Sequence, residues 1–238
     1  MSMYSSLFKP SLIHDSNEQV LLKRFFEGVS GGKFLDIGAN RAESAISFPF
    51  LKLGWSGLAV DPIPKNYEDL IANGFKSFCG AVTSEEMAKS GFLDLHVAGG
   101  DDGRKSSLDR DKIDPNLTTR IIRVPLITLH DLLRQYDLMD VDFISIDVEG
   151  HEVEVIDTLP NLENLKLLLI EDWGLDTKLY KVLSQKGFKR VLRTGYNSWY
   201  VPKADYFPIS LYGRWQLFYK MNLRAPIRKW KYKRRSSE

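Results

Sequence analysis

Short apolar runs alternate with segments of helix length along the first eighty residues. The run Lys33 to Ala39 ends in a Gly-containing turn, and Glu43 to Leu53 follows with helix character. The same order recurs with Gly57 to Asp61 and Asn66 to Asn73, and a third strand is expected near Lys76 to Val82. Alternation of this kind predicts a parallel, doubly wound α/β sheet.

The second half of the chain continues this alternation. Phe143 to Ile146 and Leu167 to Ile170 are almost continuously apolar, which is typical of strands covered on both faces. They lie within the longer strand segments Val141 to Val148 and Leu165 to Asp172. Helices are expected at Glu152 to Leu159 and Thr177 to Lys186, and closing strands at Lys189 to Arg193 and Ser198 to Pro202.

A less regular insert, at about residues 83–127, precedes Val141. Phe92 to Ala98 and Ile121 to Ile127 have strand character, whereas Gly99 to Pro115 is polar and contains glycines. Loops of this length often close over substrates. We therefore expect a mobile loop that acts as a substrate lid.

Composition limits the fold to one main core. The chain has 238 residues, of which 43% are apolar and 27% charged. We expect one α/β domain over residues 1–203 and a tail over residues 204–238. The single cysteine, Cys79, cannot form an internal disulfide, and the N-terminus does not resemble a secretory signal. No apolar run approaches the roughly 20 residues of a membrane-spanning helix, so we expect a cytoplasmic protein.

The tail differs from the rest of the chain in charge. From Arg214 onward there are nine Lys or Arg and one acidic residue, although the net charge of the chain is only +2. Five large apolar residues there share one helical face: Leu211, Tyr212, Trp215, Phe218 and Tyr219. This face either packs on the domain itself or lies on an anionic membrane, with the Arg228 to Arg235 cluster on the headgroups. The second alternative implies a peripheral location at the inner membrane face, and nucleic acid binding is the least favoured.

Candidate chemistry gathers at the first strand-to-helix turn, Asp36-Ile37-Gly38-Ala39-Asn40. In an open α/β sheet, ligands bind at the carboxyl ends of the strands, and this turn approaches them most closely. Gly38 lets the backbone pass close to a ligand, and Asn40 tolerates unusual backbone angles. Asp61 ends the second strand, where a carboxylate can accept hydrogen bonds from both hydroxyls of a ribose.

The same turn argues against a dinucleotide site. A pyrophosphate would need Gly-x-Gly-x-x-Gly, whereas this turn has one Gly and opens on an acidic residue. A carboxylate at Asp36 would repel a pyrophosphate but suits the cationic amino acid end of S-adenosylmethionine. The remaining alternative is a tight turn that binds no ligand.

Two longer strings carry a family resemblance. FLDIGANRAESAISFPFLKLGWSGLAVDPIP and DFISIDVEGHEVEVI resemble the FkbM family of methyltransferases, which carry D-x-G-A-N-x-G, G-W-x-G before an acidic-Pro strand end, and I-D-x-E-G-x-E. The resemblance covers about residues 14–202. Asp61 replaces the commoner Glu, and Ala42 replaces the last glycine of the turn. Because Ala42 adds a methyl group where a helix must approach the strand, a small shift of the cofactor pocket is expected.

The resemblance implies a class I methyltransferase fold, Rossmann-like and doubly wound, with a mostly parallel seven-stranded sheet. It also implies S-adenosylmethionine as the cofactor and transfer to a hydroxyl, with a carbohydrate of a polysaccharide or glycoconjugate as the leading hypothesis. The alternatives are methylation of RNA or another small molecule, and a non-catalytic cofactor-binding scaffold. The residues expected to hold the cofactor are Asp36, Gly38, Asn40, Asp61, Ala81, Val82 and Asp147.

An acidic cluster follows the fourth core strand, next to the expected position of the methyl group. Asp147, Glu149 and His151 are the candidate catalytic residues, and His151 is the best general base by its ordinary pKa. Glu149 could instead cap the next helix, and Glu152 could be a first-turn charge favoured by the helix dipole. A third alternative is a divalent cation held by this cluster with Asp172 as a further ligand.

Overall fold

The computed structural model describes residues 18–98, 103, 106–107, 116, 119–172, 177–207, 209, 211–224 and 226–227. The chain divides into two compact units, residues 30–165 and residues 1–29 with 166–238. The first unit carries every predicted cofactor residue and all three candidate catalytic residues. The geometry of these residues can therefore be followed within one unit.

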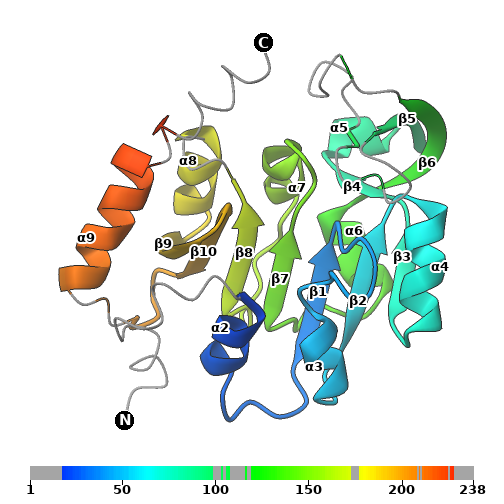
Figure 1. The fold of residues 1–238 in the computed structure, drawn as a ribbon. Helices are drawn as coiled ribbons and strands as arrows, with labels where there is room; N and C mark the ends of the chain where they lie inside the picture. Colours follow the sequence, from blue (N-terminus) through cyan, green and yellow to red (C-terminus); the bar gives the residue numbers. More distant parts are fainter. Residues whose placement is uncertain are drawn as a thin grey trace. The chain divides into compact units, whose positions relative to one another are not determined.

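Four parallel strands form the main sheet of the first unit (Figure 1). They are β1 (Lys33–Ile37), β2 (Ser56–Asp61), β3 (Lys76–Cys79) and β7 (Phe143–Ile146), in the order β3-β2-β1-β7. Because the order runs outward from β1 on both sides, the chain reverses its winding beside β1. The carboxyl ends of β1 and β7 are neighbours, since Ile37 pairs with Ile146.

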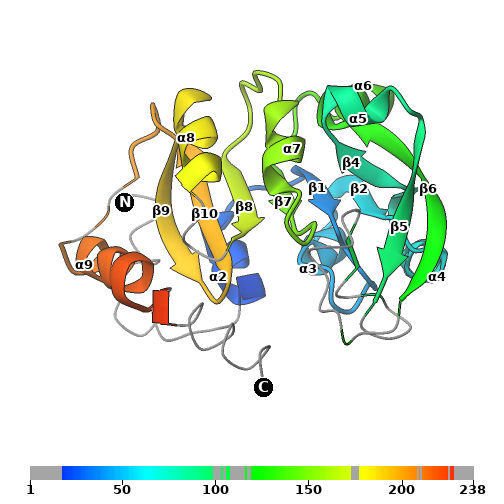
Figure 2. The ribbon, with the colours of Figure 1, turned by 90° about the horizontal axis from the view of Figure 1, so that it is seen from above.

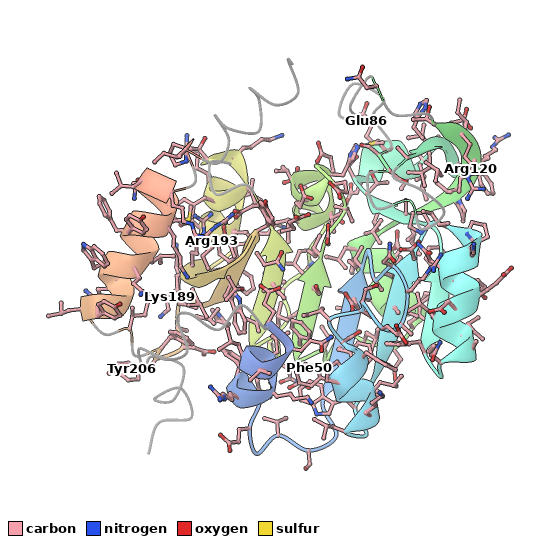
Figure 3. The ribbon with its side chains drawn as sticks, in the orientation of Figure 1. Phe50, Glu86, Arg120, Lys189, Arg193 and Tyr206 are labelled. Atoms are coloured by element: carbon pink, nitrogen blue, oxygen red, sulfur yellow. The ribbon has the colours of Figure 1, made fainter. Side chains whose placement is uncertain are left out.

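Helices cover both faces of this sheet. Figure 2 shows α3 (Phe48–Lys52) and α4 (Pro64–Ala72) on one face, and α6 (Leu129–Gln135) and α7 (Glu152–Asp157) on the other. The central strands β1 and β7 are accordingly buried on both faces, and for β7 this confirms what its continuous apolar character predicts. Phe50 of α3, labelled in Figure 3, packs against Trp55 and Phe143, with ring centroids 4.8 Å and 5.9 Å away.

The helix after β1 is shorter than predicted. The prediction of a helix from Glu43 to Leu53 is wrong at its N-terminal end, because α3 begins only at Phe48. Pro49 lies in the first turn of α3, where its missing N–H costs no helical hydrogen bond. An earlier start would place Pro49 inside the helix, so residues 41–47 form turns instead.

The predicted third strand is divided between two sheets. β3 ends at Cys79, and after Gly80 the chain enters β4 (Ala81–Thr83), which pairs in parallel with β6 (Arg120–Thr128). A Cβ at Gly80 would lie 2.5 Å from the Phe78 ring and 2.8 Å from the carbonyl oxygen of Pro125, so only glycine fits at this junction. A single strand over Lys76 to Val82 is therefore wrong.

The insert forms a small second sheet in the order β4-β6-β5, with β5 at Phe92–Val97. Both strands predicted there are confirmed, and β5 runs antiparallel to β6. A short helix, α5 (Glu85–Ala88), joins β4 to β5 and was not predicted. Most of the predicted lid, Gly99 to Pro115, lies outside the described residues.

Among the residues that the structure describes, the second unit contains three strands and four helical segments. The strands are β8 (Leu167–Glu171), β9 (Phe188–Thr194) and β10 (Asn197–Pro202), and the helical segments are α2 (Glu18–Phe25), α8 (Thr177–Gln185), α9 (Leu211–Tyr219) and the π-helix η3 (Lys220–Arg224). β10 runs antiparallel to both β8 and β9. The predicted strands and the helix at Thr177 are confirmed, whereas α2 and, in the first unit, α6 were not predicted.

The strand order of the large sheet is β3-β2-β1-β7-β8-β10-β9. The predicted doubly wound, mostly parallel seven-stranded α/β sheet is thus confirmed. Among the described residues, no helix is both long enough and apolar enough to cross a lipid bilayer.

Candidate active site

The turn after β1 is packed tightly against the end of β7. Gly38 has φ 81°, and a Cβ added there would lie 1.7 Å from the carbonyl oxygen of Asp147. The Asp147 N–H in turn donates to the carbonyl oxygen of Ile37 at 2.9 Å. Glycine is therefore required at position 38 by the neighbouring backbone, and the acidic segment that begins at Asp147 lies directly against the predicted cofactor turn.

Five successive backbone N–H groups of this turn donate to oxygens of the protein. Those of Gly38 and Ala39 donate to the carbonyl oxygen of Val60, at 2.9 Å and 3.1 Å. Those of Asn40, Arg41 and Ala42 donate to the side chains of Asp61, Asn40 and Asp69, at 2.9 Å, 2.9 Å and 2.8 Å. A phosphate-binding loop points such groups at its ligand. This turn thus lacks the geometry for a pyrophosphate, as its sequence predicts.

The carboxylate of Asp61 accepts three hydrogen bonds from the turn and the residues that follow β2. Its Oδ2 accepts the Asn40 N–H, and its Oδ1 accepts the Ile63 N–H at 2.9 Å and the Asn66 amide at 3.1 Å. Burial raises the pKa of Asp61 to about 6, although these three donors oppose the shift. The carboxylate is thus fixed in position, and its contact with a ribose stays a prediction.

Asp36 is buried and anchors the start of α3. Its Oδ2 accepts the Ser47 N–H at 3.1 Å and the Ser47 hydroxyl at 2.6 Å. Burial raises the pKa of Asp36, and the Ser47 hydrogen bonds oppose this. The structure therefore gives Asp36 a positioning role, while its direct contact with the amino acid end of a cofactor stays a prediction.

Two polar residues of α4 support the turn and were not predicted. Asn66 is fully buried against Asp61, and Asp69 accepts the Ala42 N–H. Asn66 lies four residues before the buried Leu70, so it falls on the apolar face of α4, and a polar residue on such a face is a signal that the sequence offers. Ala42 is itself fully buried, so its methyl group is accommodated in the packing.

Two of the residues expected to hold the cofactor, Ala81 and Val82, lie on β4. Ala81 is half-buried and packs against the apolar cluster of Ile63, Leu95, Val97 and Val124. Val82 is buried and pairs with Ile127 of β6. Their contact with a cofactor stays a prediction.

The segment after β7 exposes two carboxylates. Asp147 and Glu149 are both exposed, and one carboxylate oxygen of each lies within 4.8 Å of the other. Glu149 has φ 51°, a left-handed conformation that is unfavourable for a residue with a Cβ. Strain of this kind is often found at functional sites. Glu152 instead accepts the Gly150 N–H at 3.0 Å, which supports a local structural role for Glu152.

His151 differs from these two carboxylates in exposure. It is buried, at 7% relative exposure, and its carbonyl oxygen accepts the Val155 N–H as α7 begins. Its role as a general base stays a prediction. Asp147 and Glu149, in contrast, are exposed to solvent.

Asp172 is not available as the further metal ligand that was considered. Its carboxylate forms a buried ion pair with Arg193 and a second one with Arg190, at 3.3 Å. The Arg193 guanidinium also donates to the hydroxyl of Ser198 at 2.8 Å. Two cations already neutralise this carboxylate, which argues against Asp172 as a further ligand, while a divalent cation at Asp147 and Glu149 stays a prediction.

The sequence around the site matches a known protein family. A model described as the methyltransferase FkbM domain matches residues 36–186, which is more than half of the chain. The chain belongs to the FkbM methyltransferase family. The family resemblance is thereby confirmed, and S-adenosylmethionine is the methyl donor expected of this methyltransferase.

Two solved structures are similar to the chain at low identity. One is a ribosomal protein L11 methylase from Lactobacillus delbrueckii subsp. bulgaricus, 14% identical over 79% of each chain, with a TM-score of 0.43. The other is a precorrin-6y C5,15-methyltransferase from Geobacter metallireducens GS-15, 15% identical over 83% of this chain and 93% of that chain, with a TM-score of 0.40. A comparison with curated protein sequences gives no match.

Proposed function

We propose that this methyltransferase transfers a methyl group from S-adenosylmethionine to a hydroxyl of a carbohydrate. The observation that carries the proposal is the position of the exposed carboxylates of Asp147 and Glu149, which follow directly on the contact between Asp147 and Gly38. Acceptor-binding groups and the cofactor turn are therefore neighbours within one unit of the chain.

The turn offers hydrogen-bond acceptors, which the donor groups of the cofactor require. S-adenosylmethionine, when bound, supplies an electrophilic methyl group on a sulfonium, and it presents an ammonium and two ribose hydroxyls as hydrogen-bond donors. Asp61 and Asp36 are acceptors fixed by their own hydrogen bonds. Asp61 would accept hydrogen bonds from the ribose hydroxyls, and the negative charge of the turn would attract the ammonium group of the cofactor.

The exposed carboxylates suit an acceptor that presents several hydroxyls. An ionised carboxylate only accepts hydrogen bonds, so Asp147 and Glu149 could bind neighbouring hydroxyls of one sugar. With S-adenosylmethionine supplying the methyl group, one of these two carboxylates would take the proton that the acceptor hydroxyl releases, and the other would hold the sugar in line. The same two charges would repel the phosphates of an RNA acceptor, which favours the carbohydrate over that alternative.

Labelled methyl transfer tests the proposal. The full chain would be incubated with methyl-labelled S-adenosylmethionine and with polysaccharide, glycolipid or RNA fractions of cells. We expect label in a carbohydrate fraction and a loss of at least about 100-fold in turnover for Glu149→Gln or Asp147→Asn. Glu163→Gln, an exposed carboxylate of the same unit, is the matched control and should keep full turnover. Label that enters only RNA would contradict the proposed acceptor.

A further inference from the structure

The helix α9 presents its large apolar side chains to solvent. We define the α9 stripe as the exposed residues Leu211, Tyr212, Trp215, Phe218 and Tyr219. Leu211 is 85% exposed and Trp215 is 59% exposed. The Trp215 ring stacks between the rings of Tyr212 and Tyr219, with centroids 6.1 Å and 5.7 Å away. The stripe is thus an ordered aromatic surface.

The segment η3, which directly follows α9, is fixed to β9 by polar contacts. The Lys220 Nζ donates to the carbonyl oxygen of Arg193 in β9 at 2.7 Å. An Nη1–H of Arg190 donates to the Met221 sulfur at 3.1 Å. Figure 1 shows α9 beside β9 in the second unit. With η3 held in this way, the large apolar side chains of α9 are nevertheless exposed, contrary to the usual burial of the apolar face of a surface helix.

We propose that the α9 stripe lies on an anionic lipid bilayer. Tyrosine and tryptophan prefer the headgroup region, because their rings are apolar and their N–H or O–H groups stay hydrated. Arg214 and Arg224 are exposed in the same helical segment, and the chain from Arg214 onward has nine basic residues and one acidic residue. A protein segment that binds an anionic bilayer typically combines apolar side chains with flanking basic ones, as this segment does.

The charge of this segment argues against a second copy of the chain as the occupant of the stripe. A symmetric contact would bring the same strongly basic segment of both copies together, which is unfavourable. Nucleic acid explains the arginines but leaves exposed aliphatic residues such as Leu211 and Leu223 without a function. An anionic bilayer accounts for both the aliphatic and the cationic residues.

The mode of binding would be peripheral. Among the described residues no helix could span a bilayer, and α9 has nine residues. A helix of this kind lies in the plane of the interface with its apolar side in the headgroup region. The proposal does not depend on which acceptor is methylated.

Vesicle sedimentation tests this binding with the full chain. The vesicles would be phosphatidylcholine alone or phosphatidylcholine with one quarter phosphatidylglycerol. We expect binding to the anionic vesicles only, weaker at high salt, and an apparent affinity lowered at least about tenfold in Trp215→Ser/Phe218→Ser. The matched control is Tyr196→Ser, another exposed aromatic of the same unit, which should bind normally.

A conservative variant separates insertion from loss of folding. Trp215→Phe keeps an aromatic ring at the stripe, so vesicle binding should persist while quenching of tryptophan fluorescence by brominated lipid decreases. Several results would overturn the proposal: unchanged vesicle binding in the double variant, equal binding to neutral vesicles, or quenching that does not depend on Trp215. The same holds if the double substitution instead dissociates a dimer in sedimentation velocity or abolishes binding to RNA.

Discussion

The carbonyl oxygen of Asp147 lies so close to Gly38 that a Cβ on residue 38 would be only 1.7 Å from it. This contact joins the two sequence motifs of the family, which are more than one hundred residues apart in the chain. A tight backbone contact leaves little freedom for either motif to shift. The conformation of the predicted cofactor turn and the position of the segment that begins at Asp147 are therefore coupled.

Gly38→Ala should lower the free energy of unfolding much more than the same substitution at another glycine with positive φ. The added methyl group would collide with backbone that cannot move aside, and we expect a loss of at least about 3 kcal/mol in the free energy of unfolding. Gly54→Ala is the control, because Gly54 has φ 80° with no atom within 4 Å of its Cβ position, and it should cost only about 1 kcal/mol. Denaturant unfolding measures both, and similar losses would contradict the steric explanation.

Binding of S-adenosylmethionine should weaken as the pH falls through about 6. The pKa of Asp61 is raised to about 6 by burial, and the protonated form has lost acceptor capacity for the ribose hydroxyls. Below this pH the dissociation constant should rise about tenfold for each pH unit. Calorimetric titration across this range measures it. Asp61→Ala should bind weakly at every pH, and a pH-independent dissociation constant in the unaltered protein would exclude this role of Asp61.

The stability of the ligand-free protein should have the opposite pH dependence. The folded-state pKa of Asp61, about 6, lies above its ordinary value of 3.8, so the folded protein binds this proton more readily than the unfolded chain. The contribution is fully present below the unfolded value and is lost as the pH rises through about 6. It amounts to about 3 kcal/mol at most. Chemical unfolding at several pH values should show that the free energy of unfolding decreases as the pH rises through this range. Asp61→Asn should make this decrease smaller.

The buried ion pair of Asp172 and Arg193 should be essential to the second unit. Removing one partner leaves an uncompensated buried charge, so Asp172→Asn should cost about 3–5 kcal/mol in the free energy of unfolding. The double variant Asp172→Asn/Arg193→Met removes both charges and should recover part of that loss. The variant Arg193→Met alone completes the comparison. If the losses of the two single variants add up to the loss of the double variant, the two residues are not energetically coupled.

Much of the fold could be predicted because its signals are local. The apolar runs of β1, β7 and β8 and the glycine of the turn are visible within a few residues of sequence. The division between β3 and β4 was missed because it depends on Pro125, which is distant in the chain. The short α3 was missed for a local reason, since Pro49 in the first turn marks where this helix begins.

The candidate site shows the same limit of sequence reasoning. Asp61 and Asp147 could be selected because each directly follows a strand, and strand ends are where ligands bind. The partnership of Asp36 with Ser47 depends on how the chain folds back between them, and no spacing rule predicts it. The burial of His151 likewise follows from tertiary packing, so its ordinary pKa alone could not decide its role.

The strained backbone of Glu149 provides a final test of its function. Glu149→Gly removes the Cβ that makes φ 51° unfavourable, and we expect the free energy of unfolding to rise by up to about 1 kcal/mol. Turnover should nevertheless fall sharply, because the carboxylate to which we assign acceptor binding is lost. Asp137→Gly is the matched control: Asp137 is also exposed and has φ 58°, so it should gain stability without losing turnover. Full activity in Glu149→Gly would show that the strain serves no catalytic purpose.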